Sequence, residues 1–379
     1  MSGKKFNVDY AWIDSFWDKI EKKLSFVAPQ VETLFPDGTK DGKYIERGLY
    51  CWTNGFWPGM MWLMYLRTKD DKYKEIAEKV EEALDKALIG FDGLHHDVGF
   101  MWLTSAVANY RITGNKQSKN RGRHAATILA GRYNPVGKYI RAWNKWPEDD
   151  IDNHSGWAII DCMMNIQLLY WASKIDNDPR FKFIADAHAH TAMENFVRPD
   201  GSTNHIVIFD PETGDFLDNP AGQGYASGSC WSRGNSWALY GFALCYINTG
   251  NPKYLETAKK VAHYFMANLD ETGVPKCDFR QPKDPDVRDT AAGAIAACGL
   301  IEIANLVPES EKDLYLNGAV KILKGLESCC DFSMEEQSIL QKGTTMYDTP
   351  AGHHIPIIYG DYYMMEALLK LKGNELLFW

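Results

Sequence analysis

The sequence predicts an all-α fold, an (α/α)6 barrel of six helical hairpins with a short β-hairpin insertion near 204–218. The first observation is a weak repeat, in which short Asp/Asn/Gly turns recur roughly every 45 to 75 residues, the length of a helical hairpin with its connection. The second is that a strongly apolar segment precedes each turn and an amphipathic segment follows it. Because an apolar helix is buried on all sides and an amphipathic helix faces solvent on one, this alternation indicates an inner and an outer wall.

The individual hairpins are recognised by their turns. In each repeat an apolar helix ends, a polar turn follows, and a second helix carries small residues at spacings of three and four. The segments that contain the turns begin at Arg67, Arg111, Lys174, Ile247 and Leu306. A helix expected over about 10–28 supplies the remaining partner of a sixth hairpin. An open superhelical solenoid is the alternative, but the lack of polar capping repeats and the apolarity of one wall favour closure.

One region departs from the helical pattern. Residues 198–230 are rich in loop-forming residues, and HIVIFD-PETG-DFLD within them is typical of a β-hairpin with a Gly-containing turn. Long irregular insertions in compact domains are often functional. We therefore expect a binding or catalytic site at the end of the barrel that carries this insertion.

Composition limits the class of protein. The chain has 379 residues, 45% of them hydrophobic, and without a long Pro/Ser/Gly linker it is expected to form one α/α-barrel domain over 1–379. The net charge of −9 argues against nucleic acid as a partner. The 13 Trp residues suit a sugar-binding cleft, because pyranose faces stack on aromatic rings.

The sequence also bears on location. Its start has no apolar signal-peptide core, and no run of about 18 apolar residues predicts a membrane span. The eight Cys are scattered and form no CxxC pair. We therefore expect a cytoplasmic protein with reduced thiols and no membrane partner, present as a monomer or homodimer.

Asp161 is the first candidate for chemistry. It lies in GWAIIDCMMNIQLLYWA, an apolar stretch expected to be one helix with Asp161 in its middle. Apolar neighbours one turn away would raise the pKa of the carboxyl by desolvation, and Asn165 could donate a hydrogen bond to it. A carboxylic acid that stays protonated near neutral pH can donate a proton. The alternative is a structural Asp that pairs with Arg or binds a buried backbone group.

Asp97 is the second candidate, in GLHHDVGFMW. A second carboxylate near Asp161 would suit the paired-acid chemistry of sugars, whereas the alternative is a helix N-cap. Metal binding by His95 and His96 is not expected, because adjacent His residues on a turn point apart. The sequence predicts neither a metal nor a cofactor.

Four further stretches supply candidate substrate contacts. CWTNGFWPGMMW contains Trp52 and Asn54, either at the mouth of the barrel or in an aromatic core. STNHIV contains His205, which could instead lie on the surface of the hairpin. WNKWPEDD offers Trp143 or Trp146 as a stacking platform.

The fourth stretch, AGQGYASGSCWSRGNSW, contains Gln223, Arg233 and Trp237 among several Gly residues. Gly permits close approach of the backbone, and an Arg guanidinium can bind a substrate carboxylate through two parallel hydrogen bonds. The alternative for Arg233 is a salt bridge to an acid of the protein.

Six stretches together resemble one known family. They are CWTNGFWPGMMW, HHDVGFMW, IIDCMMN, WSRGNSWALYG, RDTAAGAIAACGL and GDYYMMEALLKL. In this order they look like the unsaturated glucuronyl hydrolases, glycoside hydrolase family 88. The resemblance covers roughly residues 10–370, and all six motifs in order are specific.

The resemblance implies a six-hairpin barrel and a hydrolase that removes the non-reducing-end 4,5-unsaturated uronic acid from lyase-generated oligosaccharides, of glycosaminoglycan type. Such enzymes hydrate the vinyl ether double bond. By motif, Asp161 would be the general acid/base and Asp97 the second essential carboxylate, which binds sugar hydroxyls. The substrate or water contacts would come from the matching stretches: Trp52, Asn54, His96, Trp146, His205, Gln223, Arg233 and Trp237. A proton donor of this kind implies a mildly acidic optimum.

One stretch departs from the family pattern. Members that prefer sulfated substrates resemble one another in a Ser/Lys-bearing loop near the C-terminus, whereas TTMYDTPAGHHIPIIYGDYY has neither residue. His353 and His354 are the remaining candidates for contact with an anion there. The alternative functions are an unsaturated rhamnogalacturonyl hydrolase, an ordinary inverting glycosidase that uses Asp97 as base and Asp161 as acid, and a carbohydrate-binding protein without activity.

Overall fold

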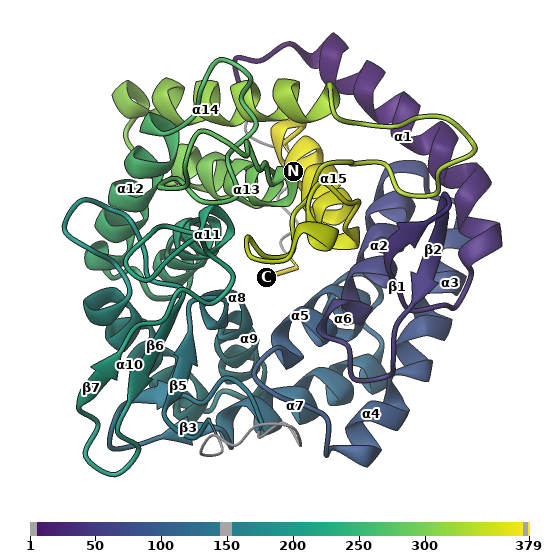
Figure 1. The fold of residues 1–379 in the computed structure, drawn as a ribbon. Helices are drawn as coiled ribbons and strands as arrows, with labels where there is room; N and C mark the ends of the chain where they lie inside the picture. Colours follow the sequence, from purple (N-terminus) through teal and green to yellow (C-terminus); the bar gives the residue numbers. More distant parts are fainter. Residues whose placement is uncertain (1–5, 145–153, 374–377) are drawn as a thin grey trace.

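The computed structural model describes residues 6–144, 154–373 and 378–379, and its helices form two concentric walls (Figure 1). The inner wall contains α2 (Phe56–Thr68), α5 (Val98–Trp102) continued by the π-helical η2 (Leu103–Val107) and α6 (Ala108–Thr113), α8 (Cys162–Asn165) with α9 (Gln167–Asp176), α11 (Ser232–Thr249), α13 (Thr290–Leu306) and α15 (Ile358–Leu371). The outer wall contains α1 (Tyr10–Val31), α3 (Asp71–Ala83), α7 (Lys116–Ala130), α10 (Pro179–Asn195), α12 (Pro252–Ala267) and α14 (Glu309–Glu327), with the short α4 (Asp85–Gly90) after α3.

The inner wall is a closed ring. Each inner helix contacts the next, and the last one, α15, packs against both α13 and α2. The first helix, α1, packs outside α15, so that the two ends of the chain form the sixth hairpin. The (α/α)6 barrel is thus confirmed in preference to the open solenoid. Closure covers the apolar faces that the terminal repeats of a solenoid would expose.

Four of the five repeated turns share one two-residue mechanism. The inner helix ends at a residue in the left-handed conformation, and the following Asp or Asn caps the outer helix through its side chain. These residue pairs are Lys69–Asp70, Gly114–Asn115, Asn177–Asp178 and Gly250–Asn251. The fifth turn, which begins after α13, instead passes through extended Val307 and Pro308.

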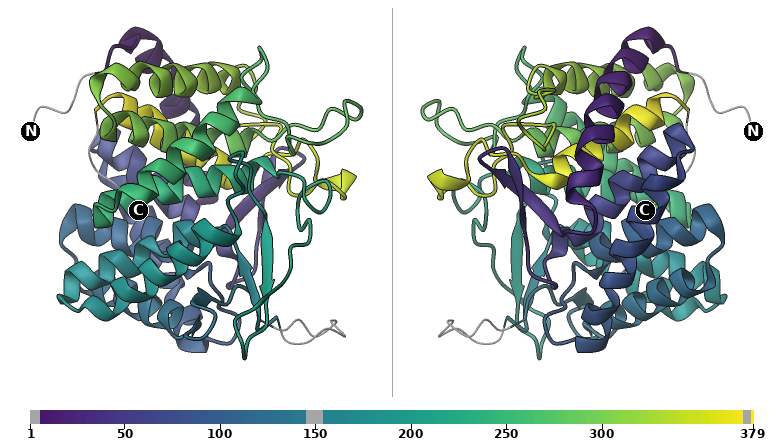
Figure 2. Two further views of the ribbon diagram at one scale, coloured as in Figure 1. Left: turned by 90° about the vertical axis from the view of Figure 1, so that its left-hand side faces the viewer. Right: turned by 90° about the vertical axis from the view of Figure 1, so that its right-hand side faces the viewer.

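The strands gather at one end of the barrel (Figure 2). A hairpin follows α1, formed by β1 (Pro36–Lys40) and β2 (Lys43–Glu46), and a small pair links β3 (Tyr133–Asn134) to β4 (Tyr139–Ile140). The predicted hairpin near 204–218 is confirmed as β6 (Ile206–Phe209) and β7 (Phe216–Asp218). A third strand, β5 (Trp157–Ile159), pairs with β6.

Strand β5 corrects the expectation of one helix over 156–172. Residues 157–159 pair with β6, and the helix begins only at Cys162. The apolar side chains of β5 fit a buried strand as well as a buried helix, because a short apolar run has no period that distinguishes the two. Pairing with a strand from the distant insertion decides between them.

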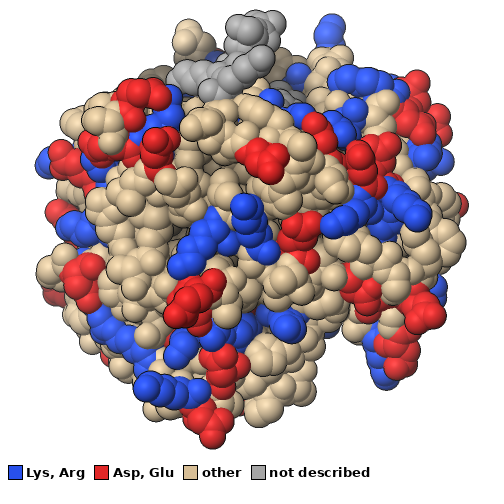
Figure 3. All heavy atoms as spheres, turned by 90° about the horizontal axis from the view of Figure 1, so that it is seen from above, with Lys and Arg blue, Asp and Glu red and all other residues tan. Residues whose placement is uncertain are grey.

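The surface carries charges of both signs, and the cysteines are unpaired. On the face shown in Figure 3, Lys and Arg are interspersed with Asp and Glu. All eight Cys are free thiols, six of them buried. Among the helices of the described ranges, none is both long and apolar enough to cross a membrane.

Candidate active site

Asp97 and Asp161 occupy equivalent places at the start of two neighbouring inner helices. Asp97 directly precedes α5 and Asp161 directly precedes α8, and the two helices are in contact. Neither side chain caps its helix. The N-cap alternative for Asp97 is therefore wrong as an account of its carboxylate, and both carboxylates remain available for other contacts.

Asn165 connects the two acids. Its Nδ2 donates to Asp97 Oδ1 at 2.9 Å and to the backbone oxygen of Asp161 at 3.2 Å, while its Oδ1 accepts from the Phe100 N–H at 2.8 Å. The expected bond from Asn165 to the Asp161 carboxyl is thus corrected, because the amide serves the other carboxylate. Gly99 permits this packing, since a Cβ there would lie 2.4 Å from the Asn165 Cα.

Two imidazoles converge on Asp97. His95 Nδ1 lies 3.3 Å from Asp97 Oδ2, and His96 Nε2 lies 3.4 Å from Oδ1. The expectation that adjacent His residues point apart is wrong here, and the three residues offer possible metal-ligand atoms within 4.8 Å of one another. Burial lowers the pKa of His95 to about 4 and that of His96 well below its usual value. The rings are therefore neutral near pH 7, and the absence of a metal from the chemistry stays a prediction.

Burial and a neighbouring charge both act on Asp97. Desolvation raises the pKa of its carboxyl well above the usual range, and the charge of Asp161 raises it further, whereas the hydrogen bond from Asn165 lowers it. Two neighbouring carboxyl groups cannot both ionise cheaply in a buried site. The pair is thus suited to holding at least one proton near neutral pH.

Asp161 has the properties of a proton donor. Its side chain is 16% exposed, and burial raises its pKa to about 7, with the charge of Arg233 opposing the shift. Its Oδ1 is buried and has no hydrogen-bond partner in the described ranges. Across from it, His205 Nε2 lies 4.0 Å away and likewise has no partner among the described residues.

A glycine-containing loop sets the protonation of His205. The Gln223 N–H donates to His205 Nδ1 at 3.0 Å, and burial lowers the pKa of the ring to about 3. The neutral ring therefore carries its proton on Nε2, the atom that faces Asp161. Gly222 has a φ of +60°, and a Cβ there would lie 1.9 Å from Nδ1, so only Gly permits this approach.

Arg233 and Gln223 both hold the segment that precedes α15. The Arg233 guanidinium forms an ion pair with Asp289 and donates to the backbone oxygens of Thr344 at 2.6 Å and Thr345 at 2.7 Å. Gln223 Nε2 also donates to the Thr345 oxygen, at 2.6 Å. The alternative of a salt bridge to a protein acid is therefore the arrangement found. Asp289 was not singled out in the sequence, although it lies in RDTAAGAIAACGL, one of the six stretches that resemble the family.

Aromatic rings form a floor beside the acids. Half-buried Trp52 lies 4.9 Å from Tyr359 and 5.2 Å from Phe100 between ring centroids. Trp237 lies 5.0 Å from Phe100 but is fully buried, so it supports the floor from behind. Tyr359 also lies against the Arg233 guanidinium, 5.5 Å from the ring centre. Trp52 is thus the partly exposed platform, and Tyr359 is a contact that the sequence did not predict.

One predicted contact is not part of this arrangement, and another lies outside the described residues. Asn54 is fully buried, and its Nδ2 donates to the backbone oxygens of Gly48 and Leu49, each at 3.0 Å. It fixes the turn that precedes Trp52. Trp146 lies outside the described residues.

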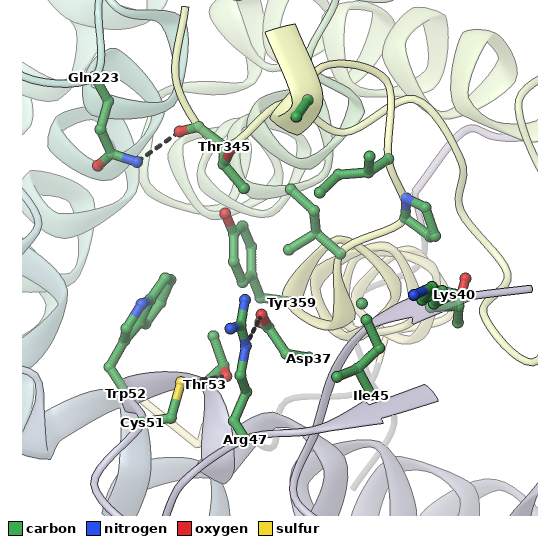
Figure 4. A pocket seen from close by; sticks show the side chains of 16 residues that line it. Asp37, Lys40, Ile45, Arg47, Cys51, Trp52, Thr53, Gln223, Thr345 and Tyr359 are labelled. Carbon is green, nitrogen blue, oxygen red and sulfur yellow. Dashed lines mark hydrogen bonds and ion pairs between the residues drawn. The ribbon is translucent and has the colours of Figure 1, made fainter. Parts of the chain in front are cut away.

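A cavity of about 510 Å³ borders the floor (Figure 4). Trp52, Gln223, Thr345 and Tyr359 line it together with residues of the β1–β2 hairpin and of the segment before α15. This volume lies within the range of about 300–1,000 Å³ typical of ligand pockets. The cavity can therefore hold a sugar-sized ligand. Neither acid lines it, and it adjoins the site through Trp52, Gln223 and Tyr359.

A closed ring of helical hairpins, a pair of buried acids and an aromatic floor match the class of α/α-barrel enzymes that act on carbohydrates. The chain belongs to Glycosyl Hydrolase Family 88, whose model matches residues 28–375, and it is a glycoside hydrolase. The unsaturated glucuronyl hydrolase of Bacillus sp. (strain GL1) is 36% identical over 343 residues, 89% of this chain and 90% of that protein.

Two further comparisons agree. The unsaturated chondroitin disaccharide hydrolase of Streptococcus pneumoniae is 34% identical over 372 residues, 96% of this chain and 92% of that protein. The crystal structure of the unsaturated glucuronyl hydrolase from Bacillus sp. GL1 superposes with a TM-score of 0.90 at 34% identity, covering 95% of this chain and 97% of that one.

Proposed function

We propose that the protein removes a non-reducing-end 4,5-unsaturated uronic acid from lyase-generated oligosaccharides by hydrating the vinyl ether double bond. One observation carries the proposal: Asp161 Oδ1 and His205 Nε2 face each other at 4.0 Å, and neither has a hydrogen-bond partner in the described ranges. Buried polar atoms are normally paired, so a substrate hydroxyl or water is the natural partner. The Asp161 carboxyl supplies the proton, because its pKa of about 7 keeps it partly protonated near neutral pH.

The reaction begins with proton transfer to carbon. The Asp161 carboxyl protonates C4 of the double bond, and the positive charge that forms is shared between C5 and the ring oxygen. Water adds at C5 and gives its proton to the Asp161 carboxylate, which restores the acid. The C5–O5 bond of the resulting hemiketal then breaks, and the hemiacetal left at C1 releases the aglycone.

The other residues of the site bind and orient the sugar and the water. Asp97, fixed by Asn165 and flanked by two neutral imidazoles, accepts hydrogen bonds from sugar hydroxyls. The Nε2–H of His205 donates to the water or hydroxyl beside Asp161. Trp52 provides a stacking face, which suits a sugar ring flattened by its double bond.

The names of the relatives support substrates of glycosaminoglycan type. The aglycone distinguishes this function from an unsaturated rhamnogalacturonyl hydrolase. The experiment offers the protein unsaturated disaccharides made by chondroitin, hyaluronan, heparin and pectin lyases, and follows the ultraviolet absorbance of the double bond together with sugar release. Loss of absorbance on the glycosaminoglycan disaccharides is the expected result.

Heavy water separates hydration from direct cleavage of the glycoside. Hydration in D2O places one deuterium at C4 before the aglycone is released. An inverting glycosidase first releases the unsaturated uronic acid with C4 unlabelled and the double bond intact, and C4 is labelled only later, when the ring-opened enol ketonises in solution, so the products are compared at early times. A carbohydrate-binding protein would bind the disaccharide without either change. Product without label would contradict the proposal.

Location and assembly stay predictions. The cytoplasmic location is tested by cell fractionation, and the monomer or homodimer by light scattering of the purified protein.

A further inference from the structure

The cavity beside Trp52 has two unlike walls. Trp52, Gln223, Thr345 and Tyr359 belong to the site described above, whereas the opposite wall is the β1–β2 hairpin, which follows α1 (Figure 4). A disaccharide with its unsaturated ring at Asp161 can extend its second sugar into this space, because Trp52 and Gln223 border both regions. The hairpin then faces the aglycone.

The hairpin carries Arg47, a cation with unused hydrogen-bond donors. Arg47 Nε donates to Asp37 Oδ2 at 2.8 Å, and its two terminal nitrogens make no hydrogen bond to any residue of the described ranges. The Arg47 side chain is 55% exposed. The hydrogen bond and charge of Asp37 raise the pKa of Arg47, so the guanidinium stays charged. A guanidinium held by one nitrogen presents its other donors to an oxyanion in a fixed direction.

The charged residues that line the cavity also favour an anion. Lys40 lines the same cavity as Arg47, so among the lining residues two cations face the single negative charge of Asp37. Glu336, which accepts a hydrogen bond from Thr39, does not line the cavity. Between Lys342 and Lys370 the chain has no Lys or Arg. The segment before α15 therefore adds no permanent positive charge to its side of the cavity.

The two His residues of that segment are already engaged. His353 Nε2 contacts the Tyr347 oxygen at 2.7 Å, and His354 Nε2 accepts from the Arg288 N–H at 3.0 Å. Neither residue lines the cavity. Arg47 thus fits an anion contact better than the two His residues to which the sequence assigned it.

We propose that Arg47, positioned by Asp37, is a specificity-determining residue that selects substrates with a sulfate ester on the sugar next to the unsaturated uronate. This inference rests on the proposed function and adds the aglycone class to it. The guanidinium donates two hydrogen bonds to the sulfate oxygens. Arg47 therefore contributes to binding of the aglycone and does not affect the proton transfer at Asp161.

The experiment compares kcat/KM for unsaturated chondroitin disaccharides with and without a sulfate on the hexosamine, measured by absorbance decay. We expect the wild type to prefer one of the sulfated disaccharides. Arg47→Gln should lower the ratio of sulfated to unsulfated kcat/KM about 10-fold, the size of one lost charge-assisted interaction. Arg47→Lys, which keeps the charge but not the fork, should retain part of the preference.

Arg180 provides a matched control. It is an exposed Arg whose Nε also lies 2.8 Å from an Asp Oδ2, but it belongs to α10 of the outer wall. Arg180→Gln should leave the ratio unchanged. An unchanged ratio in Arg47→Gln, an equal fall in Arg180→Gln, or a wild type that turns over only the unsulfated disaccharide would overturn the assignment. Wild-type turnover of the unsulfated disaccharide tests the proposed function separately, so the two failures are distinguishable.

Discussion

The replacement Asp161→Asn tests the buried acid through stability as well as activity. In the folded protein, burial makes the charged form of Asp161 unfavourable and raises its pKa to about 7. In the unfolded chain the same carboxyl ionises near its usual pKa of about 3.9. Asn has the same size and never ionises, so it removes this penalty without opening a cavity.

The magnitude follows from proton linkage. Below about pH 4 the Asp161 carboxyl is neutral in both states, so its ionisation does not change the free energy of unfolding. As the pH rises from about 4 to about 7, the unfolded state loses its proton first, and the wild type loses stability. Above pH 7 the loss is complete, and at about 1.36 kcal/mol for each pKa unit it amounts to about 4 kcal/mol. The variant should therefore match the wild type near pH 4 and exceed it by up to about 4 kcal/mol at pH 8.

Urea unfolding of both proteins at pH 4.5, 6 and 8 measures the difference in unfolding free energy. Activity should move in the opposite direction, with kcat reduced about 10²–10⁴-fold, the usual contribution of a general acid, while the disaccharide still binds. A stability difference that stays constant over this pH range would refute the assignment of a raised pKa to this carboxyl.

Four further outcomes follow from the site. The rate of hydration should fall above about pH 7 as Asp161 loses its proton, and a rate that rose through pH 8 would exclude it as the acid. Asn165→Ala should lower the unfolding free energy by about 1–3 kcal/mol in urea titrations, because it leaves a buried carboxyl and a backbone N–H without their partner. Gly222→Ala should lower kcat/KM at least about 10-fold by displacing His205, whereas Gly228→Ala, which also has a positive φ but no neighbour within 4 Å, should not; equal losses would implicate the loop backbone alone. Dialysis against EDTA should leave kcat/KM unchanged. A loss of activity that Zn²⁺ restores would instead assign a metal to His95, His96 and Asp97.

The sequence by itself determined the features that depend on neighbours along the chain. The hairpin turns were predictable because a left-handed residue followed by Asp or Asn is a local signal for ending one helix and beginning the next. The alternation of apolar and amphipathic segments determined the two walls. A lone acid among apolar residues likewise predicted the raised pKa of Asp161, because desolvation requires only that the surroundings be apolar.

Only the tertiary structure decided which distant groups meet. Strand β5 formed because the insertion supplied β6 as a partner, and this moved Asp161 from the middle of a helix to its start. In the folded protein the Asn165 amide donates to Asp97 and not to the Asp161 carboxyl. The Arg233 guanidinium, which the sequence suggested as a contact for the uronate, donates instead to the backbone of the segment before α15. Hydrogen bonds between residues far apart in the chain carry no local signature, so their partners are fixed only when the ring of helices closes.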